Sequence, residues 1–80
     1  MTLGEAFKIR FNELLKKDGR YLYKFLKDNC IPRSTVVNIL EGNTKSPNLA
    51  LIYQVANAFG MTYLEFLNAP SFKSEKVEYM

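Results

Sequence analysis

A short stretch with a proline before it and a glycine after it sets the strongest limit on how this chain can fold. The stretch covers residues 33–41 and reads Arg-Ser-Thr-Val-Val-Asn-Ile-Leu-Glu. Its apolar residues recur at the helical spacing i, i+3 and i+4, and they are Val36, Ile39 and Leu40. Pro32 is tolerated only at or before the first turn of such a helix, and Gly42 breaks it at the other end. The sequence therefore predicts a short helix over residues 33–41 with its apolar side packed inward.

The opposite side of this predicted helix carries hydrogen-bonding groups and one branched apolar side chain. These outward residues are Arg33, Ser34, Val37, Asn38 and Glu41. Such a face can read base pairs, because Arg donates two hydrogen bonds to guanine, Asn pairs bidentately with adenine, and a Val methyl contacts the methyl of thymine. The alternative is an ordinary solvated face. This helix alone does not decide between the two.

Length and composition predict one folded domain. The chain has 80 residues, of which 48% are hydrophobic and 14% aromatic, so it is too apolar to be disordered and long enough for a compact helical bundle. No apolar run approaches the roughly 18 residues that a membrane-spanning helix needs. The first residues also lack the basic-then-apolar layout of a signal peptide. We therefore expect a cytoplasmic protein.

The cysteine and histidine content argues against catalysis. Cys30 is the single cysteine, and the chain contains no histidine. An intrachain disulfide, a zinc cluster and a Cys-His nucleophile pair are therefore not expected. We predict no enzymatic activity, no metal and no cofactor. Cys30 itself is expected to be a small packing residue, since free cysteine behaves as a hydrophobe.

The net charge of +3 is concentrated in one part of the sequence. Residues 1–15 carry equal numbers of cations and carboxylates, and Lys8 and Arg10 among them are expected to be solvated. Residues 46–72 carry only Glu65. The excess lies between these segments, where the cations are Lys16, Lys17, Arg20, Lys24, Lys27, Arg33 and Lys45. A basic surface around the predicted helix 33–41 is typical of a phosphate-binding protein.

Helical periodicity predicts two helices before this one. The first covers residues 3–17, and Gly19 is expected to take the left-handed conformation that ends a helix. The second covers residues 21–29. Residues 29–32 then connect it to the helix over 33–41 across a tight corner, which is the helix-turn-helix arrangement.

Two further helices are predicted after a polar loop over residues 43–47. Asn48 is a candidate N-cap for a helix over residues 49–59, whose core-facing side chains are predicted to be Leu49, Ile52, Val55, Ala56 and Phe59. Thr62 and Glu65 have the spacing of a capping box and start a last helix that ends near residue 67. Regular structure is expected to end at residues 69–71. We therefore assign residues 1–68 to one domain and residues 69–80 to a C-terminal tail.

From about residue 9 to residue 67 the chain resembles the lambda-repressor-like (XRE or Cro/C1-type) helix-turn-helix family of small bacterial and phage DNA-binding regulators. The resemblance rests on residues 31–47, Ile-Pro-Arg-Ser-Thr-Val-Val-Asn-Ile-Leu-Glu-Gly-Asn-Thr-Lys-Ser-Pro, followed at the right distance by residues 52–61 and 65–67. Four features coincide as a set: the helix after the corner, the glycine that follows it, the Lys-x-Pro loop, and the later helix that carries alanine before its glycine end.

The resemblance implies an all-α, compact five-helix bundle whose third helix enters the major groove of double-stranded DNA. The side chains facing base edges would be Arg33, Ser34, Val37 and Asn38. The side chains holding the DNA backbone would be Tyr21, Tyr23, Lys24, Asn43, Thr44 and Lys45. The implied function is a transcriptional regulator, favoured as a repressor that acts by occupying its site, without a small-molecule ligand.

We also predict a homodimer on DNA. One reading helix presents only a few side chains, and about 1–3 kcal/mol per well-read base pair discriminates poorly against the competing sites of a genome. Two copies bound to a two-fold-related site would read twice as many base pairs and so discriminate better. Their contacts are expected near residues 66–72 or in the loop over residues 43–47.

Three positions depart from the family pattern. The family usually has glycine in the corner where this chain has Cys30, so either Cys30 or Asn29 must take a strained backbone conformation. Leu26 stands where a small alanine is usual, so the second and third helices are expected to lie slightly further apart. Leu22 replaces a polar residue that touches phosphate, and Tyr23 or Lys24 is expected to substitute for it.

Two other functions stay open. The bundle would serve as a protein-interaction module, such as an antitoxin or an anti-repressor partner, if its basic face were incidental. RNA binding is disfavoured, because the major groove of A-form RNA is too deep and narrow for a helix to read.

Overall fold

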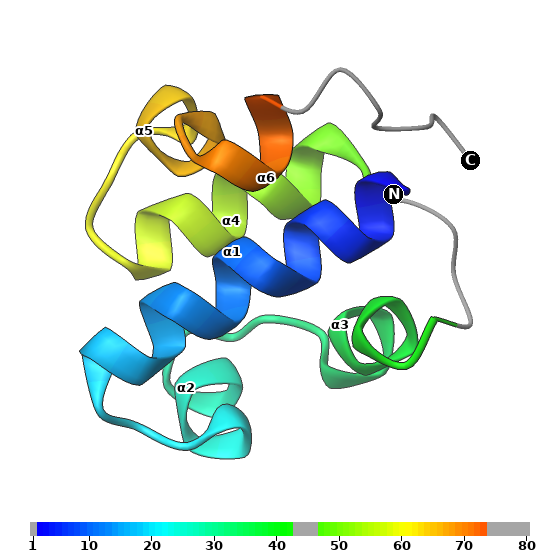
Figure 1. Cartoon of the computed structure of the whole chain (residues 1–80). Coiled ribbons are helices and arrows are strands. Elements are labelled where there is room, and N and C mark those ends of the chain that lie inside the picture. Colours follow the sequence, from blue (N-terminus) through cyan, green and yellow to red (C-terminus); the bar gives the residue numbers. More distant parts are fainter. Residues whose placement is uncertain (1, 43–46, 74–80) are drawn as a thin grey trace.

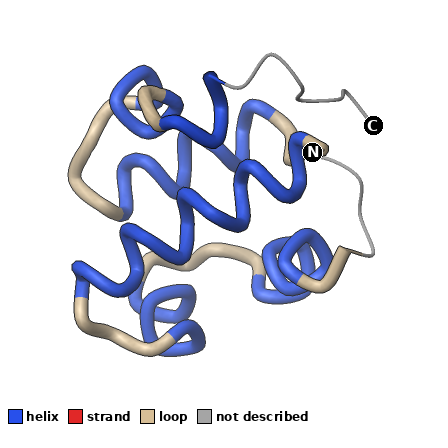
Figure 2. Tube along the Cα trace, in the orientation of Figure 1, coloured by secondary structure: helices blue, strands red, loops and turns tan. Residues whose placement is uncertain are grey.

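The computed structural model describes residues 2–42 and 47–73, and these residues form helices and turns without a β-strand (Figures 1 and 2). The helices are α1 (Leu3–Asp18), α2 (Leu22–Asp28), α3 (Arg33–Leu40), α4 (Leu49–Ala58), α5 (Tyr63–Leu67) and α6 (Pro70–Lys73). The radius of gyration of 11.7 Å is that of a compact domain of this length, for which about 12 Å is expected. The predicted compact all-α chain is confirmed, but the predicted count of five helices is wrong. Within the described ranges, no helix combines the length and the apolar composition that membrane crossing requires.

Helix α1 runs through the middle of the molecule, with α2 and α3 below it and the helices α4 to α6 above it in Figure 1. It begins with a capping box, in which the Thr2 hydroxyl accepts from the backbone N–H of Glu5 and the Glu5 carboxylate accepts from that of Thr2. It ends at Gly19, whose φ of 87° confirms the predicted left-handed cap. Its apolar stripe contacts α3 on one side and α6 on the other.

Phenylalanine rings from four helical segments form the centre of the core. The Phe7 and Phe11 rings of α1 stack with centroids 5.6 Å apart, and Phe11 meets Phe25 of α2 edge to face at 5.8 Å. Phe25 in turn stacks on Phe59, just after α4, at 4.4 Å. Phe7 also lies 5.8 Å from Phe66 of α5. These contacts hold α1, α2, α4 and α5 together, as such ring pairs do in protein cores.

Helix α4 begins where the sequence indicates, but its inward face differs from the predicted one. The Asn48 side chain accepts a hydrogen bond of 2.8 Å from the backbone N–H of Leu51, which confirms it as the N-cap. Leu49 was expected in the core and is 57% exposed, whereas Leu51 is 3% exposed. The inward stripe is set by Leu51, Ile52 and Val55, so Leu49 falls on the outward side with Tyr53, four residues later.

Helix α6 corrects the prediction that regular structure ends at residues 69–71. Ala69 is 1% exposed, and the buried Ser71 hydroxyl donates a 3.1 Å hydrogen bond to the backbone carbonyl of Ala6 in α1. The Phe72 ring lies 6.0 Å from Phe66. Pro70 suits the first position of a helix, where its missing N–H has no intrahelical partner. A helix this short shows no periodicity in the sequence, which is why it was missed.

Arg10 is not simply solvated, as the sequence had suggested. Its Nε donates to the backbone carbonyl of Phe66 and its Nη2 to that of Glu65, both at 2.9 Å. These carbonyls belong to the last turn of α5, where carbonyls lack an i+4 partner within the helix and the helix dipole is negative. The Glu65 carbonyl also accepts from the backbone N–H of Asn68. Arg10 therefore attaches the end of α5 to α1.

Candidate nucleic-acid interface

The corner between α2 and α3 is built around Cys30. The sequence left open whether Cys30 or Asn29 takes the left-handed conformation, and the structure assigns it to Cys30, with φ 53°, while Asn29 has φ −108°. The Cys30 N–H donates to the Lys27 carbonyl and the Ile31 N–H to the Leu26 carbonyl, the two bonds of a Schellman motif. This geometry turns Ile31 inward, where it is 5% exposed. Cys30 itself is exposed, so the expectation that it packs in the interior is wrong.

Helix α3 has one buried side and one polar side. Val36 and Ile39 lie in the core, at 0% and 3% exposure, and Leu40 packs against it. Among the predicted base-reading residues, Arg33, Ser34 and Asn38 are exposed, whereas Val37 is half-buried and offers less surface than expected. The outward face is therefore polar along its length.

The structure brings together two predicted site residues from different helices. The guanidinium carbon of Arg33, at the start of α3, lies 4.1 Å from the centroid of the Tyr23 ring of α2. This is the geometry of a cation–π contact. The Tyr23 side chain is still half-exposed, and Tyr21, at the start of the same helix, is 71% exposed. The sequence predicted Tyr23 and Arg33 in one region of the fold, but no local pattern predicts that their side chains touch.

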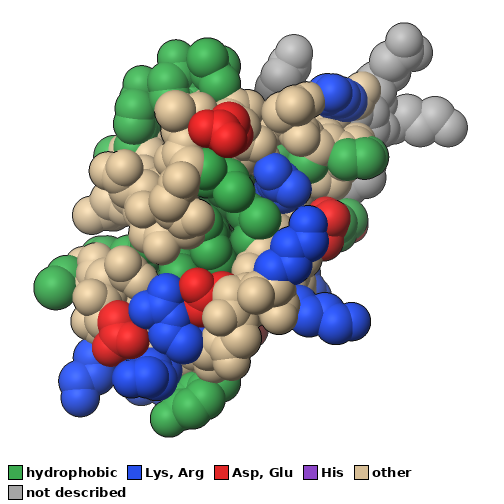
Figure 3. Space-filling model, turned by 90° about the vertical axis from the view of Figure 1, so that its left-hand side faces the viewer, with side chains coloured by type: hydrophobic (Ala, Val, Ile, Leu, Met, Phe, Trp, Pro, Cys, Tyr) green, Lys and Arg blue, Asp and Glu red, His purple; other side chains and the backbone are tan. Residues whose placement is uncertain are grey.

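The basic surface is smaller than the sequence count of cations indicated. Arg20 binds Asp18 at 2.6 Å and Asp28 at 3.2 Å, and its guanidinium also lies over the Phe25 ring. Lys24 pairs with Asp28 at 3.5 Å. Figure 3 shows this intermixing of cations and carboxylates on the lower part of the face, where α2 lies. Arg20 is thus a structural residue that ties the end of α1 to α2.

These contacts shift the acid–base equilibria of the cluster. Hydrogen bonding to Arg20 lowers the pKa of Asp18 and, together with the charge of Lys24, that of Asp28. The same hydrogen bonds raise the pKa of Arg20. Within the described part of the chain, Lys16, Lys17 and Lys27 form no ion pair. Among the described residues of α2 and α3, the cations without an ion pair are therefore Lys27 and Arg33, and Lys24 is partly neutralised.

The remaining predicted DNA-backbone contacts are Lys24, Asn43, Thr44 and Lys45. Asn43, Thr44 and Lys45 fall outside the described residues, so they stay a prediction. Lys24 is exposed on α2, next to Tyr23. The predicted site residues that the structure describes therefore all belong to α2, its N-cap Tyr21, and α3.

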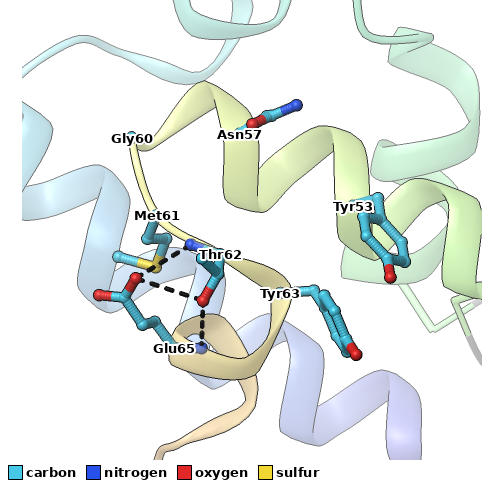
Figure 4. A pocket seen from close by; sticks show the side chains of 7 residues that line it. All are labelled: Tyr53, Asn57, Gly60, Met61, Thr62, Tyr63 and Glu65. Carbon is cyan, nitrogen blue, oxygen red and sulfur yellow. Dashed lines mark hydrogen bonds between the residues drawn. The ribbon is translucent and has the colours of Figure 1, made fainter.

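A shallow depression of about 670 Å³ lies between α4 and α5 (Figure 4). Tyr53 and Asn57 of α4 line one side, and Met61, Thr62 and Tyr63 line the other. The Tyr53 and Tyr63 rings lie 4.5 Å apart, and the neighbouring Tyr63 side chain raises the pKa of Tyr53.

Two of the polar side chains that line this depression, those of Thr62 and Glu65, belong to one capping box. The Glu65 carboxylate accepts from the Thr62 N–H at 3.2 Å, and the Thr62 hydroxyl accepts from the Glu65 N–H, which confirms the predicted capping box. Over the described residues, no group of three His, Cys, Asp or Glu side chains could hold a metal ion. The depression is therefore an aromatic surface feature without an assembled set of reactive groups.

Comparison with known proteins adds no assignment. No protein-family model, no curated protein and no solved structure matches this chain. The geometry of α2 and α3 is therefore the basis for a proposed function.

Proposed function

We propose that the chain binds double-stranded DNA in a sequence-specific manner and acts as a transcriptional regulator, most simply a repressor that occupies its site. In this proposal α2, the corner and α3 form a helix-turn-helix within a lambda-repressor-like fold, and α3 enters the major groove. The observation that carries the proposal is α3 itself. One side of it is anchored in the core, and the opposite side presents Arg33, Ser34 and Asn38 to solvent.

The chemistry of this exposed side suits base edges. Arg33 and Asn38 are the two residue types that bind guanine and adenine bidentately, and Ser34 can donate to or accept from either. A helix whose other side is packed against α1 cannot rotate to hide these groups. The exposed Tyr21, at the start of α2, and Lys27, near its end, would meet the phosphates on one flank.

Selection of bound duplexes from a random pool tests the proposal directly. We expect one preferred sequence, bound with an affinity whose logarithm falls linearly with the logarithm of salt concentration, by about 0.9 per phosphate contact. Replacing Asn38 by Ala should cost roughly 1–3 kcal/mol on the preferred site and relax the preference at one base pair. Asn12→Ala is the matched control, because Asn12 is also exposed but lies on α1.

The outcome also separates the alternatives. If the chain binds no duplex even at roughly 50 mM salt, the phosphate-contact argument fails. The protein-interaction module, an antitoxin or anti-repressor partner, then becomes the better reading. An equal loss on every sequence for Asn38→Ala would instead remove Asn38 from the base-reading set.

The homodimer is part of the proposal, and the exposure of single side chains supports one location for its contacts. Phe66, at one predicted contact region, is completely buried and cannot contact a second copy. Nearby, Leu64 is 64% exposed and Tyr53 is 47% exposed. Hydrophobic side chains gather at the top of Figure 3, where α5 lies. Helix α4 carries no charged residue and α5 only Glu65, so one carboxylate per copy is the only like charge that these two helices would bring to a contact between two α4–α5 faces.

Sedimentation at saturating protein tests this arrangement. We expect two chains per selected duplex, with half-sites one helical turn apart, about 34 Å. Leu64→Lys should weaken binding to the full site while leaving binding to an isolated half-site unchanged. Selected sites without an inverted repeat, with one chain per duplex, would rule the dimer out.

A further inference from the structure

Tyr23 and Arg33 form an exposed pair that bridges α2 and α3. The guanidinium of Arg33 lies over the ring at 4.1 Å, yet the ring remains 50% exposed and takes no part in the aromatic core. The sequence had assigned the two residues different tasks, Tyr23 to the DNA backbone and Arg33 to the bases. Their contact suggests that they share one.

We propose that Tyr23 is a positioning residue that holds Arg33 so that it reads a guanine. The proposal rests on the proposed DNA-binding function and deepens it. A guanidinium that stacks on a ring turns a flat face to it and keeps its N–H donors, which lie in the plane, at the edge. Guanine presents O6 and N7 to the major groove as a pair of acceptors that matches two such donors. The ring of Tyr23 thus sets the plane in which Arg33 meets the base.

This role predicts an effect on specificity more than on general affinity. A mobile Arg side chain can bend toward any nearby acceptor, including phosphates, and it loses rotational freedom when it binds a base. An Arg already held on a ring loses less of that freedom and meets fewer alternative acceptors. Removing the ring should therefore weaken the preferred duplex while changing duplexes without the guanine much less.

The competing role for Tyr23 is a hydrogen bond from its hydroxyl to a phosphate. The two roles use different parts of the side chain, so Tyr23→Phe and Tyr23→Leu separate them. Tyr23→Phe keeps the ring and removes the hydroxyl, whereas Tyr23→Leu removes both. Tyr21→Leu is the matched control, since Tyr21 is an exposed tyrosine at the start of the same helix for which no contact with an Arg is found in the described residues.

The test measures the Kd of the full chain and these variants for the selected duplex and for duplexes in which each guanine pair is replaced in turn. We expect Tyr23→Leu to lower discrimination at one guanine about three- to tenfold and Tyr23→Phe to retain it. In an Arg33→Ala background, where that discrimination is already lost, Tyr23→Leu should have no further effect at that position. Tyr21→Leu should leave discrimination at every guanine unchanged, so that any change in Kd is the same for all duplexes.

A measurement on the free protein checks the geometry without DNA. The side-chain protons of Arg33 should show a ring-current shift in the NMR spectrum that persists in Tyr23→Phe and disappears in Tyr23→Leu. Thermal unfolding should be similar in all variants, since the pair lies outside the core.

Several results would overturn the inference. A uniform loss on every duplex for Tyr23→Phe would assign Tyr23 to a phosphate. An equal effect of Tyr23→Leu with and without Arg33, or no effect at any guanine, would show that the ring does not act through Arg33. In each of these three cases the proposed function would stand, because duplexes are still selected. A wild-type chain that selects no duplex would overturn the proposed function and this inference together.

Discussion

Replacing Arg10 by Met should destabilise the fold by about 2 kcal/mol, although Arg10 lies on the surface of α1. Methionine keeps a long unbranched side chain and a good helix propensity, but it removes both hydrogen bonds to the end of α5. A hydrogen bond from a charged donor contributes about 1.5–3 kcal/mol when it is shielded from water and much less when it is exposed. The bond to the Phe66 carbonyl is partly buried and the bond to the Glu65 carbonyl is exposed, so we count only the first in full.

Urea unfolding followed by far-UV circular dichroism measures this loss. In a thermal unfolding experiment, a loss of about 2 kcal/mol in the free energy of unfolding corresponds to a fall in Tm of about 8–16 °C for a domain of this size. The dependence on urea should keep its slope, because the surface exposed on unfolding is unchanged. Lys8→Met is the matched control: it removes a cation from the same helix, but Lys8 is exposed, and its effect should stay within about 0.5 kcal/mol. If Arg10→Met behaved like Lys8→Met, the attachment of α5 through Arg10 would be refuted.

Three further predictions concern the acidic cluster, the corner and the last helix. Since Arg20 lowers the pKa of Asp18 and Asp28 from the ordinary 3.8, the unfolded chain binds more protons, and the free energy of unfolding should fall as the pH drops below about 4. Urea titrations between pH 7 and 2 measure this fall, and it should be shallower in Arg20→Gln than in the wild-type chain. An unchanged pH profile in Arg20→Gln would contradict the ion pairs of Arg20 with Asp18 and Asp28. Cys30→Gly should raise the free energy of unfolding by about 0.5–1 kcal/mol, because φ is 53° there, while Cys30→Val should lower it. A fragment of residues 1–68 should be less stable than the whole chain by at least about 2 kcal/mol, since it lacks Ala69, Phe72 and the Ser71 hydrogen bond; equal urea midpoints would show that α6 contributes nothing.

The features that could be predicted from the sequence are those that depend on neighbouring residues. Helical stripes located α1 to α5, because buried residues recur every three or four positions within one helix. Asn48, Thr62 and Gly19 marked helix ends correctly, because a cap is recognised within a few residues of the end it stabilises.

The features that were missed depend on residues far apart in the chain. Arg10 contacts carbonyls 55 and 56 residues away, and no local pattern points to a backbone partner at that distance. The stacking of Arg33 on Tyr23 and the neutralisation of Arg20 by two aspartates also required the packed arrangement of α1, α2 and α3. The exposure of Arg33, Ser34 and Asn38 on α3 was predicted correctly, and that of Val37 was not. The spacing of apolar residues within one amphipathic helix is enough to predict which side faces outward.

The hydrogen bond between Ser71 and Ala6 spans 65 residues and therefore bears on how the protein is made. During synthesis α1 leaves the ribosome first, and its apolar stripe then has no partner from α5 or α6. Closing a contact over so long a segment costs more chain entropy than closing a local one, although the cost rises only logarithmically with length. The core around Phe7 can thus be completed only after nearly all of the described chain has emerged. Until then α1 presents the kind of exposed apolar surface that chaperones bind and that leads nascent chains to aggregate.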